Sequence, residues 1–301
     1  LGHLRYGTFG KNSIENCAPT LRQNNWKSRN LILAGNFNMT NLDYLFHELV
    51  AIGQSPKEKS DTVTILEKVG HFLDEENNRI YNKYSDSLPK KDISLKIEED
   101  LDVCNILKNS FKDFDGGYAL AGLIGHGSSF VARDPNGIRP LYYYVNDEII
   151  VGASERPPIK TAFGCEFDEI NELKRGNALI VDKSGNYKVE EFIEPKENKA
   201  CSFERIYFSR GNDPDIYKER KKLGKLLLPQ VFDSINNDLK NTIFSYIPNT
   251  SETCFYGMID GIKDYLTEKK KEIFIDKKSY DGSPEDLIYL KTRIEKLVSK
   301  D

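Results

Sequence analysis

The sequence predicts an α+β protein over residues 1–200, followed by the start of a second, α/β domain over residues 201–301. Amphipathic helix patterns dominate before residue 115, and short alternating strand patterns joined by turn residues follow them. A polar break at Glu194–Ala200 marks the expected domain boundary, and strand and helix patterns alternate beyond it. That last order is typical of a parallel sheet with crossover helices. A chain of 301 residues is long enough for two such domains.

Composition excludes several classes of protein. The net charge of −4 and the pI near 5.8 argue against a broad electrostatic grip on nucleic acid or an anionic membrane. Apolar residues make up 39% of the chain and aromatic residues 11%, which is enough to bury a core and excludes a disordered chain. No apolar run approaches the roughly 18 residues of a membrane helix. The five cysteines are odd in number and widely scattered, so we expect a reducing, cytoplasmic location.

The first third of the chain is expected to alternate strand and helix. A buried strand over Asn30–Ala34 ends at a turn beginning with Gly35, and Thr40 or Asn41 caps the helix that follows. Ser60 caps a second helix. The polar residues from Asp74 to Asp92 predict a surface loop, and the apolar spacing predicts a third helix over Leu95–Phe114.

The rest of the chain carries hairpin signals and then a strand–helix order. Turn residues separate three pairs of strands: Ala119–Ile124 with Phe130–Arg133, Leu141–Val145 with Glu148–Ala153, and Ala178–Val181 with Tyr187–Glu190. The second domain is predicted to contain strands at Arg205–Ser209 and Thr242–Ile247, and helices at about Tyr217–Ile235 and Glu252–Tyr265. Pro229 should kink or end the first of these helices. The Lys/Glu-rich tail from Lys263 is expected to be a solvated helix face or an insertion.

Three short segments carry candidate binding residues, each with a plainer alternative. Residues 2–10 are glycine-rich and contain Arg5, whose guanidinium is suited to a carboxylate or phosphate, or is simply a surface arginine. Asn36 and the backbone N–H of Phe37 follow the predicted strand and offer two oxyanion donors, or form an ordinary polar turn. Asp61, in the first turn of a helix, complements the helix dipole or binds a ligand ammonium group.

Other chemistries find no support in the sequence. His126 lies beside Ser128 and Ser129, but this segment has no strand–turn–helix frame for a serine nucleophile, and we expect a hairpin tip. The histidines and cysteines lack metal-ligand spacing, and no phosphate-binding loop or dinucleotide fingerprint is present.

Taken in order, these segments resemble the class II glutamine amidotransferases, and within them the amidophosphoribosyltransferases. The matching segments, from residue 2 to about 266, are GHLRYGTFG, LAGNFNMTN, KSDTVTIL, ARDPNGIRPLYY, VGASE, CSFERIYFSR and SYIPNTSET. The resemblance implies an N-terminal-nucleophile hydrolase fold, a four-layer αββα sandwich, for residues 1–200. It implies the N-terminal part of a phosphoribosyltransferase domain for residues 201–301.

The resemblance also implies a two-site enzyme of purine biosynthesis. Such enzymes release ammonia from glutamine and use it to displace pyrophosphate from phosphoribosylpyrophosphate (PRPP), which binds with Mg²⁺. By position, Arg5 and Thr8 should hold the glutamine carboxylate, Asp61 its ammonium, and Asn36 with the Phe37 N–H the oxyanion. Purine nucleotides as feedback ligands and a homo-oligomer are further expectations, without nucleic acid or membrane partners. Some members ligate an iron–sulfur cluster near the position of Cys201, where we expect a small buried hydrophobic residue instead.

Three departures from the family pattern shape the expectation for this polypeptide. The chain begins at Leu1, so the family's nucleophilic cysteine is absent from it, and about 60–80 upstream residues are expected to be missing. Phe37 stands where the family has glycine, so a bulky side chain could alter the pocket. The sequence also stops before the family's PRPP loop. We therefore expect the fragment itself to be inactive and to bind no cofactor, and the intact parent to be active.

Two alternatives remain open at this point. The glutaminase half of a glucosamine-phosphate synthase would share residues 1–200, but the strand–helix order after residue 200 and the SYIPNTSET segment favour phosphoribosyl chemistry. A non-catalytic scaffold or regulatory paralogue would retain only the fold, and Phe37 is the residue that favours this reading.

Overall fold

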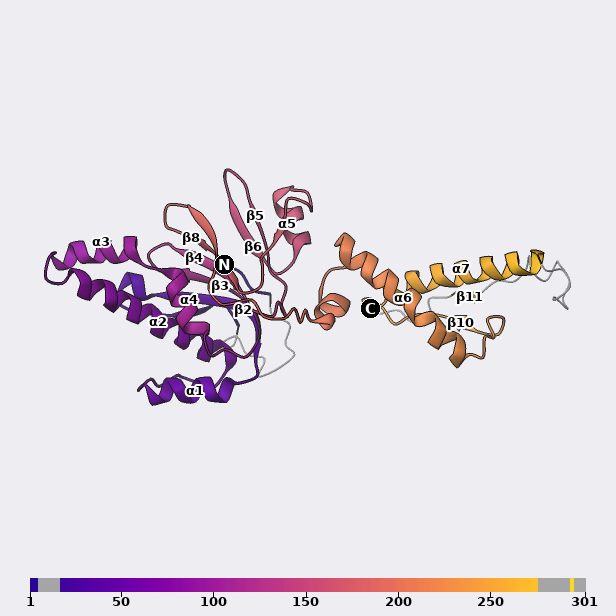
Figure 1. Ribbon diagram of the computed structural model, residues 1–301, viewed down its shortest axis with the longest axis horizontal. Coiled ribbons are helices and arrows are strands. Elements are labelled where there is room, and N and C mark those ends of the chain that lie inside the picture. The colour runs from indigo at the N-terminus through magenta and orange to yellow at the C-terminus, as the bar shows by residue number, and fades with distance from the viewer. Residues whose placement is uncertain (5–16, 276–292, 295–301) are drawn as a thin grey trace. The chain divides into compact units, whose positions relative to one another are not determined.

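The chain forms two compact units, Leu1–Cys201 and Ser202–Asp301 (Figure 1). The computed structural model describes residues 1–4, 17–275 and 293–294, and each unit is considered by itself. None of the described helices is both long and apolar enough to cross a membrane.

A six-stranded antiparallel sheet lies at the centre of the first unit. Its order is β1-β2-β3-β4-β8-β9. The strands are Thr20–Arg22 (β1), Leu31–Met39 (β2), Gly116–Ile124 (β3), Ser129–Arg133 (β4), Asn177–Val181 (β8) and Tyr187–Glu191 (β9). The predicted hairpins β3–β4 and β8–β9 are confirmed, and Gly127 and Gly185 supply the positive φ that their tight turns require.

The next four helices of the chain lie on one side of this sheet: the first, second and fourth pack against it, and the third packs on the second (Figure 1). They are Leu42–Ala51 (α1), Asp61–Tyr84 (α2), Lys90–Asp100 (α3) and Val103–Phe111 (α4), with a short 3₁₀ turn, η2, at Lys27–Arg29 before β2. Ser60 caps α2 as predicted, since its hydroxyl accepts a hydrogen bond from the Val63 N–H at 3.4 Å. The core between helices and sheet includes Leu107, Phe111 and Tyr118, which are fully buried.

A second sheet covers the opposite face of the first. Its order is β6-β5-β7, formed by Ile150–Ala153 (β6), Tyr142–Val145 (β5) and Asn171–Glu172 (β7), so the hairpin predicted from Leu141–Val145 and Glu148–Ala153 is also confirmed. A core that includes Ala119 and Leu179 of the large sheet and Tyr143 of the small one joins the two sheets. The helix α5, Arg156–Phe163, packs on the outer face of the small sheet. The unit is therefore layered α-β-β-α.

The sequence misplaced several boundaries in this unit. The predicted strand Asn30–Ala34 does not end at Gly35, because β2 continues to Met39. The expected loop from Asp74 to Asp92 is largely helix, since α2 runs to Tyr84 and α3 starts at Lys90.

The polar residues at the end of α2 explain that error. Glu76 and Asn77 are almost fully buried there, paired with Arg79 and with Ser28, so their polarity reflects hydrogen bonding inside the unit. The single helix expected over Leu95–Phe114 is two helices, and Asp102 starts the second one by capping the Asn105 N–H.

The second unit consists mainly of two long helices. These are Pro214–Ser234 (α6) and Glu252–Ile275 (α7), together with a short π-helical segment, η3, at Glu204–Phe208. Two-residue strands Ile243–Phe244 (β10) and Arg293–Ile294 (β11) pair in parallel, with α7 between them in the chain. This is the strand–helix–strand order expected of an α/β domain.

The strand predicted at Arg205–Ser209 is wrong, because residues 204–208 are helical. Pro229 does not end α6, which continues through it to Ser234. Leu228 and Phe232, on either side of the proline, pack in the core of this unit and hold the helix in place despite the lost hydrogen bond.

Candidate functional site

Asp61 is a half-buried carboxylate at the start of α2. Its Oδ2 accepts a hydrogen bond from the Met39 N–H at 3.2 Å, at the end of β2. Burial raises the pKa of Asp61 above its ordinary value, and the Met39 N–H acts in the opposite direction. Within the part of the chain that the structure describes, no lysine or arginine forms an ion pair with it. A carboxylate in this state is suited to an external ammonium group, which would restore the lost solvation.

Asn36 lies on the face of β2 that is turned toward the small sheet. It pairs in register with Ala119 of β3, and residues directly opposite each other in a sheet share a face. Ala119 belongs to the core between the two sheets, so the Asn36 side chain lies on the same face. The expected turn at Gly35–Asn38 is therefore replaced by a regular strand that presents Asn36 in a defined direction.

The Phe37 side chain lies on the other face of β2. Its register partner, Tyr118, is fully buried in the core beneath the helices, and Phe37 packs against that core. The bulk of Phe37 is thus directed away from the face that carries Asn36. The Phe37 side chain therefore occupies none of the space on the face that carries Asn36.

Hydrogen bonds on β3 determine where the Phe37 N–H points. The Tyr118 carbonyl accepts from the Asp134 N–H at 2.9 Å, and the Tyr118 N–H donates to Asp134 Oδ2 at 3.4 Å. Both backbone groups of Tyr118 are therefore turned toward β4 and away from β2. In an antiparallel ladder this makes Phe37 and Tyr118 a pair without mutual hydrogen bonds, so the Phe37 N–H points away from β3.

Met39 supplies an independent check of this direction. It lies two residues after Phe37 and has the same orientation in the strand, and its N–H donates to Asp61. The N–H groups of Phe37 and Met39 therefore project from the same edge of β2, roughly 7 Å apart along the strand. Among the described residues, β1 pairs with that edge only as far as Leu33.

The structure thus brings three of the predicted site residues to one end of β2. Asn36 and Phe37 are adjacent on the strand, and Asp61 is hydrogen-bonded to it two residues further on. The other two predicted residues, Arg5 and Thr8, lie outside the described residues.

Two hollows on the first unit lie elsewhere. One, of about 460 Å³, lies between the start of α4 and β9, and the other, of about 520 Å³, is lined by residues that include Arg133 and Asn198. Neither is lined by Asn36, Phe37 or Asp61. The candidate site is therefore defined by the strand β2 and by the hydrogen bond that joins it to Asp61.

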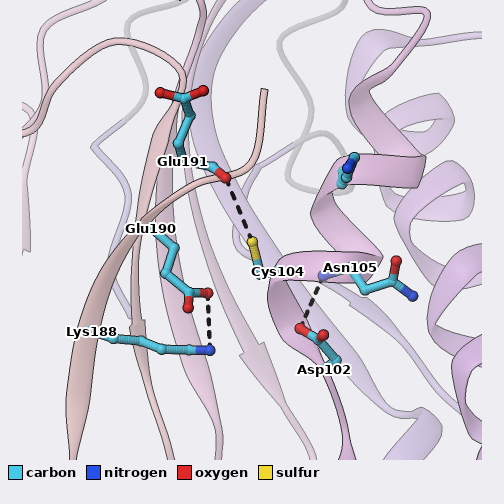
Figure 2. A pocket seen from close by; sticks show the side chains of 7 residues that line it. Asp102, Cys104, Asn105, Lys188, Glu190 and Glu191 are labelled. Atoms are coloured by element: carbon cyan, nitrogen blue, oxygen red, sulfur yellow. Dashed lines mark hydrogen bonds and ion pairs between the residues drawn. The ribbon is translucent and has the colours of Figure 1, made fainter. Parts of the chain in front are cut away.

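The smaller hollow contains a thiol, Cys104, but not an activated one. Figure 2 shows Cys104 and Asp102 of the α4 end facing Lys188, Glu190 and Glu191 of β9. Burial, with a contribution from the Glu190 carboxylate, raises the pKa of Cys104 to about 11. A nucleophilic cysteine needs the opposite shift, so Cys104 is no substitute for the family's catalytic thiolate.

His126 and Ser128 are in contact, within the hairpin tip that the sequence predicted. At the tip of the β3–β4 hairpin, the Ser128 hydroxyl lies 2.9 Å from His126 Nε2, and both side chains are buried. Burial lowers the pKa of His126, so the imidazole is mostly neutral at pH 7. Neither of the two hollows is lined by this pair.

No metal centre is found in the described part of the chain. There, no three side chains of His, Cys, Asp or Glu cluster closely enough to hold an ion. Cys201 is only partly buried. The described residues therefore do not fit an iron–sulfur cluster, and they provide no ligand set for Mg²⁺.

Comparison with known proteins identifies relatives. A family model described as a glutamine amidotransferase domain matches residues 76–161. The amidophosphoribosyltransferase of Bacillus subtilis (strain 168) is 31% identical over 75% of this chain and 42% of the relative. That of Methanocaldococcus jannaschii is 27% identical over 85% of this chain and 51% of the relative. This chain is a relative of the amidophosphoribosyltransferases.

Solved structures of this family agree in fold. Glutamine PRPP amidotransferase from B. subtilis, complexed with ADP and GMP, matches with a TM-score of 0.58 and 28% identity, covering 87% of this chain and 49% of that one. An allosteric regulatory enzyme of purine biosynthesis matches with a TM-score of 0.60 and 28% identity, covering 86% and 48%. The first unit is thus an N-terminal-nucleophile hydrolase fold, as the resemblance implied.

The chain spans about half or less of the length of these amidophosphoribosyltransferases. The family model for the amidotransferase domain covers residues 76–161 and so includes none of Asn36, Phe37 and Asp61. Their roles remain predictions that rest on the motifs and on the geometry of β2.

Proposed function

We propose that this chain is the glutaminase part, and the beginning of the transferase part, of an enzyme for glutamine-dependent amidophosphoribosyl transfer. The reaction converts glutamine, PRPP and water to 5-phosphoribosylamine, glutamate and pyrophosphate. The support is the αββα fold together with relatives that carry this name. On this proposal residues 1–200 belong to the glutaminase domain and residues 201–301 to the phosphoribosyltransferase domain.

One observation carries the assignment of the glutamine site. The Phe37 N–H and the Met39–Asp61 hydrogen bond lie on the same edge of β2, roughly 7 Å apart. One extended amino acid the size of glutamine spans that distance, with its ammonium at Asp61 and its side-chain carbonyl near Phe37. Arg5 and Thr8 are proposed to hold the carboxylate of the same molecule.

The proposed residues divide the chemistry between binding and catalysis. Asp61 binds the ammonium in the ground state and in the transition state alike, so it contributes to affinity. The Asn36 amide and the Phe37 N–H donate to the oxygen that becomes negative when a nucleophile attacks the side-chain amide. The nucleophile itself is assigned to no residue of this chain.

The transferase half of the proposal concerns the parent protein. PRPP with Mg²⁺ is its expected second substrate, and no described residue is assigned to either. The similar B. subtilis structure is complexed with ADP and GMP, which supports purine nucleotides as regulatory ligands here too. Assembly into a homo-oligomer stays a prediction.

The test separates the two half-reactions in the full-length protein. Replacing Asn36 with alanine removes one oxyanion donor, so glutamine-dependent turnover should fall about 100-fold or more, chiefly in kcat. Turnover with free ammonia should be unchanged, because ammonia bypasses the glutamine site. Asn109→Ala, on the exposed face of α4, is the matched control. Unchanged glutamine turnover in Asn36→Ala would show that the site is misassigned.

A further inference from the structure

The loop that follows β4 is held by one buried carboxylate. Asp134 is fully buried, and its Oδ1 accepts the N–H groups of Asn136 at 3.0 Å and Ile138 at 2.9 Å. Its Oδ2 accepts the Arg139 N–H at 3.0 Å. A carboxylate that accepts several backbone N–H groups fixes a loop strongly, because such charge-assisted bonds are stronger than neutral ones.

The neighbouring side chain fixes the carbonyls of the same loop. The Arg133 guanidinium donates to the Arg139 carbonyl at 2.8 Å, to the Gly137 carbonyl at 3.3 Å and to the Leu173 carbonyl at 2.7 Å. Gly137 has φ = +64°, a conformation that favours glycine. Two consecutive side chains thus satisfy both donors and acceptors of residues 134–139, which makes the loop rigid.

On one side, this loop is attached to the strand beside the candidate glutamine site. Asp134 exchanges hydrogen bonds with both backbone groups of Tyr118, which lies opposite Phe37. The Ile138 side chain covers Gly117, where an added Cβ would lie only 2.6 Å from Ile138 Cγ2. A displacement of the loop therefore reaches β3 next to the residues that carry the proposed oxyanion donors.

On the other side, the loop holds the segment through which the chain leaves the first unit. The backbone N–H groups of Lys196, Lys199 and Cys201 donate to the carbonyls of Pro135, Asn136 and Ile138 at 2.8, 2.8 and 3.1 Å. The Asn136 side chain also donates to the Glu197 carbonyl at 2.9 Å. Cys201 is the last residue of the first unit, so residues 196–201 are hydrogen-bonded to the loop as far as the end of that unit.

We propose that Asp134 is a positioning residue that rigidly couples the exit segment, residues 196–201, to the strand pair carrying Asn36 and Phe37. A change in the path of the exit segment is transmitted through residues 134–139 to β3 and then to the oxyanion donors. This deepens the proposed function and rests on it for its catalytic consequence. It gives the glutamine site a means of responding to the state of the chain beyond residue 201.

The test uses Asp134→Asn, with Asp182→Asn as a matched control. Asparagine keeps one oxygen that can accept hydrogen bonds. Its NH₂ group replaces the other carboxylate oxygen and so faces backbone N–H groups that it cannot accept from. Asp182 holds the β8–β9 turn in the same way, accepting the Ser184 and Asn186 N–H groups at 2.8 and 2.9 Å. Its turn lies at the opposite end of β4, since Ser129 pairs with Val181.

The rate of backbone hydrogen exchange in the 301-residue chain measures this coupling without an activity assay. Asp134→Asn should speed exchange at least tenfold both in residues 116–120 and in residues 196–201, and Asp182→Asn should change neither segment. Faster exchange confined to residues 134–139 would overturn the proposal. So would an equal increase throughout the first unit, which would make Asp134 a residue of general stability.

A second variant keeps the proposal testable if Asp134→Asn does not fold. Asn136→Ala removes only the side-chain bond to the Glu197 carbonyl and leaves the carboxylate in place. It should speed exchange severalfold in residues 196–201 and also in residues 116–120. A change in the exit segment alone contradicts the coupling.

Kinetics of the full-length protein test the catalytic consequence. Asp134→Asn should lower kcat for glutamine hydrolysis at least tenfold with less than a twofold change in KM, because the oxyanion donors act in the transition state. A normal kcat in a variant with altered exchange at residues 116–120 would overturn the positioning role. A different result would contradict the proposed function itself. In that case Asn36→Ala would leave glutamine turnover unchanged, whatever the hydrogen exchange of Asp134→Asn.

Discussion

The two units of this chain are stabilised in different ways. The first has separate cores on both faces of its six-stranded sheet, one beneath α1, α2 and α4 and one against a second sheet. The described core of the second is mainly the contact between α6 and α7, together with residues such as Leu239 and Phe244. A strand supported on both faces can hold adjacent side chains in opposite, defined directions, as β2 does for Asn36 and Phe37. A pair of helices provides one interface only.

The substitution expected to change the stability of one unit most is Phe111→Ala. Phe111 is fully buried and contacts the rings of Phe114 and Tyr118 at centroid distances of 4.5 and 4.9 Å. Its removal should lower the free energy of unfolding of the first unit by about 4 kcal/mol. Hydrogen exchange should quicken in β3 and remain unchanged in α6 and α7. Phe163→Ala, at an exposed position, should have little effect, and equal loss of protection in both units would refute their independence.

Asp61→Asn tests whether a residue of the first unit serves glutamine binding and not the stability of that unit. The loss of a charged partner for the glutamine ammonium should raise KM roughly 30-fold, corresponding to about 2 kcal/mol, with kcat less affected. Asp43→Asn is the control, since Asp43 also lies in the first turn of a helix but pairs with the exposed Lys59. A normal KM for glutamine in Asp61→Asn would exclude the proposed ammonium site.

The same variant carries a pH prediction. Because the pKa of Asp61 is raised in the folded state above the ordinary 3.8, the folded protein binds this proton more tightly than the unfolded chain does. The contribution of Asp61 to stability therefore falls as pH rises from 3.8 through the raised pKa. Asp61→Asn should be at least as stable as the wild type at pH 7, as measured by urea unfolding. A variant less stable than the wild type would mean that the ionised form is favoured by folding.

Gly224→Ala tests the helix pair of the second unit. An added Cβ at Gly224 would overlap the Cys254 carbonyl of α7, whereas one at Gly211 would meet its neighbours at 3.5 Å or more. Overpacking costs up to about 3 kcal/mol, and alanine regains about 1 kcal/mol as the better helix former. We expect a net loss of at most about 2 kcal/mol, seen as faster exchange in α6 and α7 only. Gly211→Ala is the control, and equal behaviour of both variants would argue against the close approach.

The smallest effect is expected at the ion pair between the same helices. Lys225 lies 2.9 Å from Asp264, and both side chains are substantially exposed. Lys225→Met should lower the free energy of unfolding by less than about 1 kcal/mol, and the difference should shrink at high salt. A loss comparable to that of Gly224→Ala would mean that charge pairing, and not close packing, holds the helices together.

How far the sequence predicted the site can be seen from particular residues. Asp61 was found because a carboxylate directly after a good N-cap is visible in the sequence. Asp134 was not singled out, although aspartate at the start of an Asp-Pro-Asn-Gly turn commonly accepts nearby backbone N–H groups. What no local pattern could reveal is that its carboxylate is buried and also bonded to β3 and that its loop holds residues 196–201, which lie about sixty positions later.

The sequence by itself determined the hairpins, the Ser60 cap, the order of motifs and hence the family, because turn chemistry, capping and motif order are properties of neighbouring residues. Only the tertiary structure decided that β2 continues through Gly35, that the polar end of α2 is helix, and that residues 204–208 are helical. It also decided the direction of the Phe37 N–H, since that depends on which strand bonds to Tyr118 from its far side. Such choices are made by partners distant in the chain, through the pairing of strands and the burial of polar side chains.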